Sequence, residues 1–283
     1  MSASESSPAD GAVAEHIARG EGMEITSHIV TTPPRDAATV VLLRDGAQGL
    51  EVFLMKRAAQ SDVLGGAYVF PGGKVDGADA IAAQALLSDA AHHALVPRLG
   101  EPDLAADVAA AFYVAAVREA FEECGVQLAA ADLFPWVRWI TPRQASLMNK
   151  RFDTRFFLAV MPADQAAVHD NHETTASAWM TPREALTRYW AREFDMAPPQ
   201  IMSLVHLGGH ATAASVLAEA QTRLPPTIEP APFDHEGMRV ICYPGDERHP
   251  LATPAVPGPT RLMFRNRRFE PSSGTLEELL AGW

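Results

Sequence analysis

The pattern of hydrophobic positions predicts a β-hairpin early in the chain. Apolar residues dominate from Ala38 to Leu43 and again from Leu50 to Lys56. Between these runs lies Asp45-Gly46-Ala47-Gln48-Gly49. A glycine-containing connection of this length is typical of antiparallel strands that are adjacent in sequence. We therefore expect the first two strands to pair with each other.

Two helical segments are predicted downstream of the hairpin. Residues 80–94 are rich in Ala and Leu, and prolines and a glycine at 97–102 break the pattern. A second helix is expected to begin near Asp103, a plausible N-cap, and to run through Cys124. Gly125 then ends it, as glycine commonly does at the position after a helix.

The rest of the chain continues to intersperse strands and helices. Strands are predicted at 133–140, 151–160, 176–180, 239–243 and 261–264, and helices at 198–207 and 211–222. A further helix begins with Thr181 as N-cap, Pro182 at its first position and Glu184 at its third. Because the first hairpin is antiparallel, the pattern favours an α+β fold with a mixed sheet covered by helices.

Composition and charge narrow the class of protein. The chain has 283 residues, of which 47% are hydrophobic and 20% charged, as in a folded soluble protein. A net charge of −12 argues against nucleic acid as a partner but leaves room for a local basic pocket that binds a small anion. Two cysteines make no disulfide framework, and no run of apolar residues suggests a signal peptide or a membrane span. We expect a cytoplasmic protein without membrane partners.

The segment with the strongest chemical pattern is 118–126, Arg-Glu-Ala-Phe-Glu-Glu-Cys-Gly-Val. Wound as a helix, it places Glu119, Glu122 and Glu123 on one face beside Arg118. The opposite, core-facing side is expected to hold Val114, Val117, Ala120, Phe121 and Cys124. Like charges repel on a helix, and a hard divalent cation with oxygen ligands would relieve that repulsion. A solvated acidic face is the alternative interpretation.

Taken with an upstream turn, this segment resembles the Nudix hydrolase family. The family motif has a glycine, five residues and an acid, which here are Gly73 and Asp79, followed downstream by the 118–126 segment. Two departures stand out. The family usually has Glu where this chain has Asp79, and it has about seven residues before the arginine, whereas residues 80–117 number 38 here.

The long insertion between the two halves is similar to a branch that includes peroxisomal acyl-coenzyme A diphosphatases. Other similarities are the Leu54–Arg57 run, the Phe70–Gly73 turn and the strand around 151–157. The resemblance implies a Nudix fold, an α/β/α sandwich with a mixed central sheet. It divides the chain into a flexible tail at 1–26, a core at 27–190 with a helical insertion at 80–110, and an extension at 191–283. That extension either caps the substrate pocket or forms a homodimer contact.

The resemblance also assigns roles to individual residues. Glu119, Glu122 and Glu123, with the carbonyl of Gly73, would hold Mg²⁺ or Mn²⁺ ions, which clamp a diphosphate and lower the pKa of a bound water. Arg118 would orient Glu122 by an i,i+4 ion pair. The family commonly places a metal-binding or general-base Glu in the loop that here contains Glu173. The catalytic set is thus Arg118, Glu122, Glu123 and Glu173.

Local cations are needed to receive a polyanion on an acidic protein. The candidates for the substrate phosphates are Arg57, Lys74, Arg151 and Arg155. Arg151, Asp153 and Arg155 share one face of a predicted strand, so a cross-strand ion-pair ladder is an equal alternative for the two arginines. His169 and His172 fall on a predicted loop and are expected to be solvent-exposed.

The function predicted from these residues is metal-dependent hydrolysis of a phosphoanhydride in a nucleoside diphosphate derivative. Coenzyme A or acyl-coenzyme A is the first expected substrate, and ADP-ribose, dinucleoside polyphosphates and nucleoside triphosphates are alternatives. A second class of function is a nucleotide-sensing Nudix-type module without activity. That class predicts a degraded motif, and all three helix carboxylates are present here.

Overall fold

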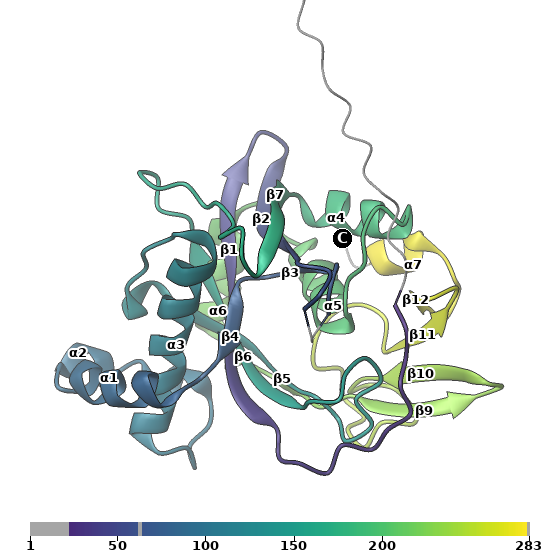
Figure 1. Cartoon of the computed structure of the whole chain (residues 1–283), viewed down its shortest axis with the longest axis horizontal. Coiled ribbons are helices and arrows are strands. Elements are labelled where there is room, and N and C mark those ends of the chain that lie inside the picture. Colours follow the sequence, from purple (N-terminus) through teal and green to yellow (C-terminus); the bar gives the residue numbers. More distant parts are fainter. Residues whose placement is uncertain (1–22, 62–63, 282–283) are drawn as a thin grey trace, which may run out of the picture.

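A mixed β-sheet forms the centre of the molecule (Figure 1). The computed structural model describes residues 23–61 and 64–281. Over these residues the sheet has eight strands, in the order β3-β2-β1-β6-β5-β8, with β4 paired to β1 and β7 to β2. The strands are β1 (Arg35–Gly46), β2 (Gly49–Arg57), β3 (Tyr68–Val69), β4 (Gly72–Lys74), β5 (Phe134–Ile140), β6 (Phe152–Val160), β7 (Thr174–Met180) and β8 (Thr227–Ile228).

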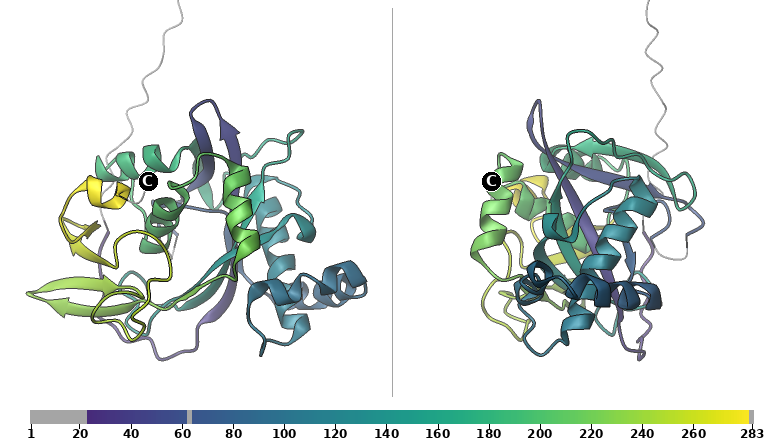
Figure 2. Two further views of the ribbon diagram at one scale, coloured as in Figure 1. Left: turned by 180° about the vertical axis from the view of Figure 1, so that it is seen from behind. Right: turned by 90° about the vertical axis from the view of Figure 1, so that its left-hand side faces the viewer.

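Helices lie on both sides of this sheet, and a second, antiparallel sheet adjoins one side. The helices are α1 (Gly77–Leu87), α2 (Ala90–His93), α3 (Ala106–Cys124), α4 (Pro182–Trp190), α5 (Pro198–Leu207), α6 (Ala213–Thr222) and α7 (Leu276–Leu280). Two 3₁₀ turns occupy Val96–Leu99 and Ala130–Asp132. The second sheet contains β9 (Ala231–His235), β10 (Met238–Cys242), β11 (Arg261–Arg265) and β12 (Arg268–Pro271). Helices α1 to α3 flank one side and α4, α5 and α7 the other (Figures 1 and 2).

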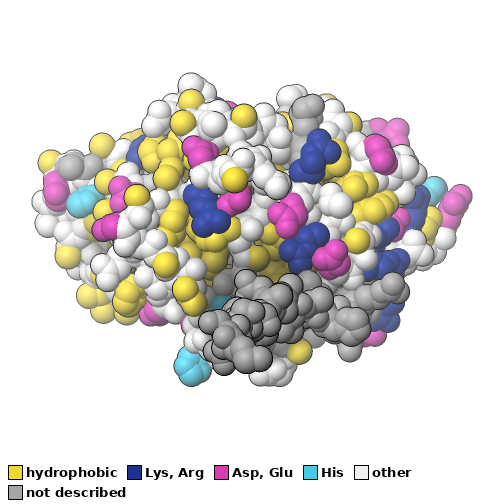
Figure 3. Space-filling model, turned by 90° about the horizontal axis from the view of Figure 1, so that it is seen from above, with side chains coloured by type: hydrophobic (Ala, Val, Ile, Leu, Met, Phe, Trp, Pro, Cys, Tyr) yellow, Lys and Arg dark blue, Asp and Glu magenta, His cyan; other side chains and the backbone are white. Residues whose placement is uncertain are grey.

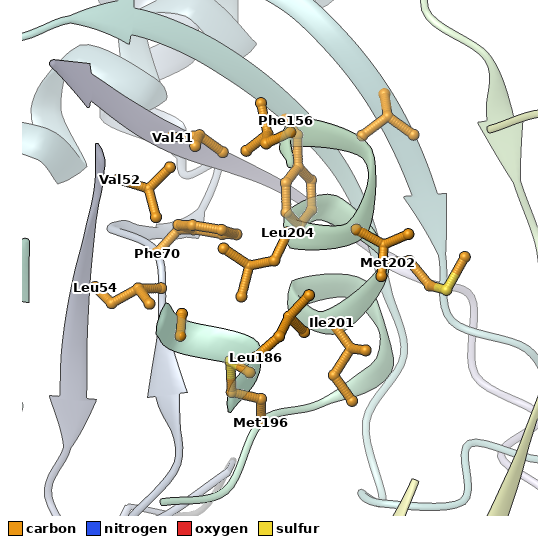
Figure 4. Close-up of a cluster of buried hydrophobic side chains, with 14 of the residues drawn as sticks. Val41, Val52, Leu54, Phe70, Phe156, Leu186, Met196, Ile201, Met202 and Leu204 are labelled. Carbon is orange, nitrogen blue, oxygen red and sulfur yellow. The ribbon is translucent and has the colours of Figure 1, made fainter. Parts of the chain in front are cut away.

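Strand β1 connects the two cores because its side chains alternate between the faces of the sheet. Val40 and Leu42 are buried with α3 in one cluster. Val41 and Leu43 are buried in the other, which also contains residues of α4 and α5. Figure 4 shows this second cluster, with Val41 and Phe156 near Leu204 of α5. The predicted α+β mixed sheet with flanking helices is confirmed.

The predicted hairpin is confirmed, with a shorter loop than expected. Strands β1 and β2 pair antiparallel as far as Gly46 opposite Gly49, so only Ala47 and Gln48 connect them. Strand β1 also pairs in parallel with β6, from Arg35 opposite Phe152 to Leu43 opposite Val160. This non-local pairing aligns the beginnings of two strands that are more than 100 residues apart in the sequence.

Several local expectations differ from the structure. The helix predicted at 80–94 is divided into α1 and α2, and α1 begins after an N-cap at Asp76. Helix α3 begins at Ala106, and Asp103 does not cap it. Phe121, expected in the core, is 52% exposed. Of the predicted tail, residues 1–22 lie outside the described residues. The Met23 amide donates a hydrogen bond to the Arg267 carbonyl, and the Thr26 amide donates one to the Ser146 carbonyl.

Among the described residues, the structure contains no helix that is both long enough and apolar enough to span a membrane. On the face seen from above, acidic and basic side chains lie close to each other (Figure 3).

Candidate active site

Helix α3 carries the acidic cluster, and it buries two of the three carboxylates. Glu119 is 9% exposed and Glu123 is 5% exposed, whereas the side chain of Glu122 is 54% exposed. The helix ends at Gly125, which adopts a left-handed conformation with φ of 72°, as expected for a residue that follows a helix. A solvated acidic face, the alternative considered for this helix, therefore does not describe Glu119 and Glu123.

The turn at Gly72 and Gly73 lies directly against these two buried carboxylates. The Gly72 amide donates a hydrogen bond of 2.8 Å to Glu123 Oε2. A Cβ atom added to Gly73 would overlap the carboxylate of Glu119. A Cβ atom added to Gly72 would lie 2.5 Å from the carbonyl oxygen of Ala38 in β1. A side chain at position 72 would collide with the backbone of β1, and one at position 73 would displace the Glu119 carboxylate. The two halves of the motif therefore meet despite the insertion between them.

Arg118 holds the motif together. Its guanidinium binds both oxygens of Asp79, at 2.8 and 2.9 Å, and donates 2.8 Å hydrogen bonds to Glu119 and Glu122. It also donates to the carbonyl of Lys74 at 2.9 Å. The i,i+4 pair with Glu122 is the one expected from the sequence. Asp79, 1% exposed, thus occupies the place of the usual Glu and still reaches the arginine.

Asp79 has a second partner that explains how so short a side chain is positioned. The Asp79 carboxylate accepts a hydrogen bond from the Asp76 amide, and the Asp76 carboxylate in turn accepts from the Asp79 amide. This reciprocal capping box fixes the beginning of α1. Helix α1 packs on α3, so the insertion returns Asp79 to Arg118.

A cleft of about 330 Å³ opens between the glycine turn and these carboxylates. Glu119, Glu123 and Glu173 line it, and Glu122 is absent from its lining. The Glu173 carboxylate lies 3.7 Å from Arg57 Nη2. Four cationic side chains also line the cleft, namely Arg35, Arg57, Lys74 and Lys150. The cleft therefore offers carboxylates and cations together, although the whole chain is acidic.

Burial destabilises the negative charge of Glu119 and Glu123. Desolvation raises the pKa of Glu123 to about 8, opposed by the hydrogen bond from the Gly72 amide. Desolvation also raises the pKa of Glu119, opposed by the nearby Arg118. A divalent cation would stabilise the ionised forms of both groups. Two adjacent, poorly solvated carboxylates supply the hard oxygen donors that Mg²⁺ or Mn²⁺ prefers, so the residues fit such an ion.

Two of the predicted phosphate ligands, Arg151 and Arg155, do not line the cleft, so their prediction as substrate ligands is wrong. Arg155 is 4% exposed and binds Glu101 through hydrogen bonds of 2.9 and 2.6 Å. Arg151 is 9% exposed and donates to the Thr141 carbonyl at 2.8 Å. Arg138 completes a buried network through Asp153, at 2.6 and 2.8 Å. The ion-pair ladder, the alternative interpretation, describes Arg155, whereas Arg151 contacts the Thr141 carbonyl and Glu229. Arg57 and Lys74 do line the cleft.

Arg35 and Lys150 were not found from the sequence. Arg35 is the first residue of β1, and Lys150 lies two residues before β6. The parallel pairing of these strands aligns their beginnings beside the cleft. The position of each cation near the beginning of a strand was the only sign in the sequence that it could bind substrate. The pairing of β1 with β6 could not be predicted from the residues around either cation.

The described residues contain one other group of side chains suited to metal binding, far from the acidic helix in sequence. His206, His210 and Glu219 lie within 4.8 Å of one another. Glu219 accepts 2.9 Å hydrogen bonds from both histidines and a 2.7 Å hydrogen bond from Arg223. The buried Nδ1 of His206 has no partner, so a proton there would be unsatisfied. A neutral His206 with its proton on Nε2, bonded to Glu219, accounts for the geometry without an ion.

Comparisons with known proteins support the family suggested by this site. A family model described as the NUDT19 Nudix domain matches residues 130–207. The chain is similar to a Caenorhabditis elegans protein named as a nudix hydrolase 7, with 26% identity over 84% of this chain and 82% of that protein. It is also 26% identical to the Gallus gallus acyl-coenzyme A diphosphatase NUDT19, over 76% of this chain and 80% of that protein.

Solved structures show the same fold. A NUDIX hydrolase from Alicyclobacillus acidocaldarius has 27% sequence identity and a TM-score of 0.54, covering 69% of this chain and 98% of that one. These similarities support a member of the Nudix hydrolase family, and the relatives named nudix hydrolase and acyl-coenzyme A diphosphatase support a pyrophosphohydrolase. Within that family it is similar to the proteins named NUDT19.

Proposed function

We propose that this chain is a metal-dependent diphosphatase that cleaves coenzyme A or acyl-coenzyme A. One observation carries the proposal beyond the family. The carboxylate cleft continues into an apolar cavity of about 190 Å³, and the two share lining residues, namely Thr39, Leu64, Phe152, Thr154 and Gln200. A substrate that joins a diphosphate to a long uncharged arm fits this arrangement. The NUDT19 relatives are named acyl-coenzyme A diphosphatases, which agrees with this arrangement.

Within the cleft, the chain's own groups divide the work. Glu119, Glu123 and the carbonyl of Gly73 would hold Mg²⁺ or Mn²⁺, with the exposed Glu122 able to join them from the same helix. When bound there, such an ion would neutralise phosphate charge and lower the pKa of a bound water. Arg57, Lys74, Arg35 and Lys150 receive the phosphate oxygens. Arg118 orients Glu119 and Glu122 through its hydrogen bonds and does not touch the substrate.

Glu173 is the candidate general base in this proposal. Its side chain is 66% exposed and lines the same cleft as Glu123. Arg57 Nη2 lies 3.7 Å from this carboxylate, which can accept the proton that the attacking water releases. The bond that breaks is the phosphoanhydride, and water supplies the oxygen that one phosphate gains.

One assay tests the proposal. Purified protein with Mg²⁺ or Mn²⁺ is presented with coenzyme A, acyl-coenzyme A, ADP-ribose, a dinucleoside polyphosphate and a nucleoside triphosphate. We expect coenzyme A derivatives to give the highest kcat/KM. Glu123→Gln should lower it at least about a hundredfold, because removing one metal ligand disrupts charge stabilisation in the transition state.

Glu184→Gln serves as the matched control, since Glu184 is a helix carboxylate on α4 with 47% side-chain exposure outside the cleft. A preference for ADP-ribose would reject the coenzyme A assignment. Absence of turnover for every compound would favour the nucleotide-sensing module. Undiminished activity in Glu123→Gln would reject the metal-site assignment. A cytoplasmic location and a homodimer, both expected from the sequence, stay predictions that gel filtration and fractionation can test.

A further inference from the structure

The apolar cavity beside the cleft contains buried polar atoms that have no partner within the protein. Trp139 and Gln200 both line it and are 5% and 8% exposed. The indole Nε1 of Trp139 and the side-chain oxygen Oε1 of Gln200 make no hydrogen bond. Leaving such groups unpaired and away from water is unfavourable. Two unpaired polar groups in one cavity indicate a ligand that bonds to them.

The Gln200 side chain does not cap its own helix. Gln200 is the third residue of α5, where a Gln often reaches back to cap the helix. The N-cap here is Ala197, and the helix has no side-chain capping hydrogen bond. Helix α5 is itself held firmly, since Ile201, Met202 and Leu204 are buried in the core (Figure 4). The Gln200 amide is therefore preorganised at the junction of cleft and cavity.

The two unpaired atoms have complementary chemistry. An indole N–H can only donate, and an amide oxygen can only accept. A secondary amide has one C=O and one N–H, so it satisfies both. Most of the remaining lining is apolar, including Ile140, Met148, Phe156 and Ile241, and its other polar side chains are the hydroxyls of Thr39, Thr141, Ser146 and Thr154. The cavity thus suits an uncharged chain interrupted by an amide better than a plain alkyl chain, which would leave both atoms unpaired.

We infer that Trp139 and Gln200 are specificity residues that recognise a secondary amide in the uncharged arm of the substrate. This inference rests on the proposed function, because the pantetheine arm of coenzyme A contains two such amides next to its diphosphate. It adds to that function a polar recognition element that selects amide-bearing arms over plain alkyl arms and over sugars.

Binding of pantetheine, which has the amides but no diphosphate, tests the inference directly. Calorimetry on the full chain compares wild type with Gln200→Leu, which removes the acceptor at similar volume, and Trp139→Phe, which removes the indole N–H with a smaller ring. Each should weaken pantetheine binding about tenfold, equivalent to about 1.4 kcal/mol. The same variants should raise KM for coenzyme A about tenfold with kcat close to wild type, since the contact is the same in the ground and transition states.

Two controls separate recognition from general packing. Met148→Leu changes an apolar lining residue and should leave pantetheine affinity within about twofold. 1-Octanol, an alkyl ligand without an amide, should bind Gln200→Leu at least as well as wild type. Equal loss of pantetheine binding in Met148→Leu, or wild-type affinity in both Gln200→Leu and Trp139→Phe, would overturn the inference.

Failure of the inference and failure of the proposed function give different results. If coenzyme A is cleaved but Gln200→Leu and Trp139→Phe behave as wild type, the substrate stands and amide recognition is wrong. If coenzyme A is not cleaved but the two variants still lose pantetheine binding, the amide site stands and the substrate is wrong. Urea unfolding of both variants confirms that neither result comes from loss of the fold.

Discussion

The guanidinium of Arg118 binds both carboxylate oxygens of Asp79, at 2.8 and 2.9 Å, although 38 residues separate them in the sequence. Asp79 is 1% exposed, so the pair lies in a poorly solvated environment. The same arginine binds Glu119 and Glu122. The pair thus connects the beginning of the insertion to the acidic helix.

Replacing Arg118 with Ala should destabilise the protein by about 3–5 kcal/mol, because it leaves the buried Asp79 carboxylate without its cation. Urea unfolding measures this change. Arg44→Ala is the matched control, since Arg44 forms a 2.7 Å pair with Glu51 but has 45% side-chain exposure. Exposed pairs contribute about 0–1 kcal/mol. Equal losses in the two variants would show that burial does not strengthen the Arg118 pair.

The two glycines of the turn should respond differently to alanine. In Gly73→Ala the new Cβ meets the flexible end of Glu119, which can move, so activity should fall at least about tenfold with little loss of stability. In Gly72→Ala the new Cβ meets the backbone of β1, which cannot yield cheaply, so stability should fall by about 2–3 kcal/mol. Comparing kcat/KM with urea midpoints checks both; a reversed order would contradict the geometry.

Arg57 and Arg155 should separate substrate binding from folding. Arg57→Met removes a cation from the cleft and should raise KM about tenfold with a small change in stability. Arg155→Met leaves Glu101 partly unpaired in the core and should cost about 3 kcal/mol. The folded fraction of Arg155→Met should retain wild-type KM. A raised KM in that variant at low temperature would restore Arg155 as a candidate substrate ligand.

Metal binding should stabilise the fold. Mn²⁺ at a hundred times its Kd should add about 2.7 kcal/mol to the unfolding free energy, because the ion binds only the folded site. Chelation by EDTA should remove this gain. Glu123→Gln should reduce the gain at the same Mn²⁺ concentration, and Glu184→Gln should not. The same gain in Glu123→Gln and wild type would place the ion somewhere other than the cleft.

His206 should make the protein sensitive to mild acid. Burial lowers the pKa of His206 to about 4, only partly opposed by the adjacent Glu219, with His210 and Arg223 also nearby. The unfolded chain, with a His pKa near 6.5, therefore binds more protons between about pH 4 and 6.5, and stability falls as the pH decreases through that window. At pH 5 this one group should cost about 2 kcal/mol relative to pH 7.5.

Urea unfolding at pH 7.5 and pH 5 measures the effect of His206 against His206→Gln. The glutamine can still donate to Glu219 but does not titrate. We expect the stability of wild type to fall by about 2 kcal/mol more than that of the variant over this range. The same pH dependence in both proteins would show that His206 ionises normally in the fold.

The elements with strong local patterns could be predicted, whereas their neighbours in space could not. Helix α5 was predicted with the bounds observed, and the Thr181 cap of α4 forms a 3.1 Å hydrogen bond with the Glu184 amide. Both depend on interactions within a few residues. The side of α3 that faces the core was only partly predicted, because packing against the glycine turn buries Glu123 and leaves Phe121 exposed.

The sequence by itself determined the family motif, because Gly73, Arg118 and the glutamates are recognised by residue type and spacing. It also determined most strands and helices through local periodicity. Only the tertiary structure decided which cations reach the cleft. The parallel pairing of β1 with β6 sets the positions of Arg35 and Lys150. Arg151 and Arg155 do not line the cleft, because they are buried against the Thr141 carbonyl and Glu101. Long-range pairing and burial fix the surroundings of a charged group, and neither is encoded in its local sequence.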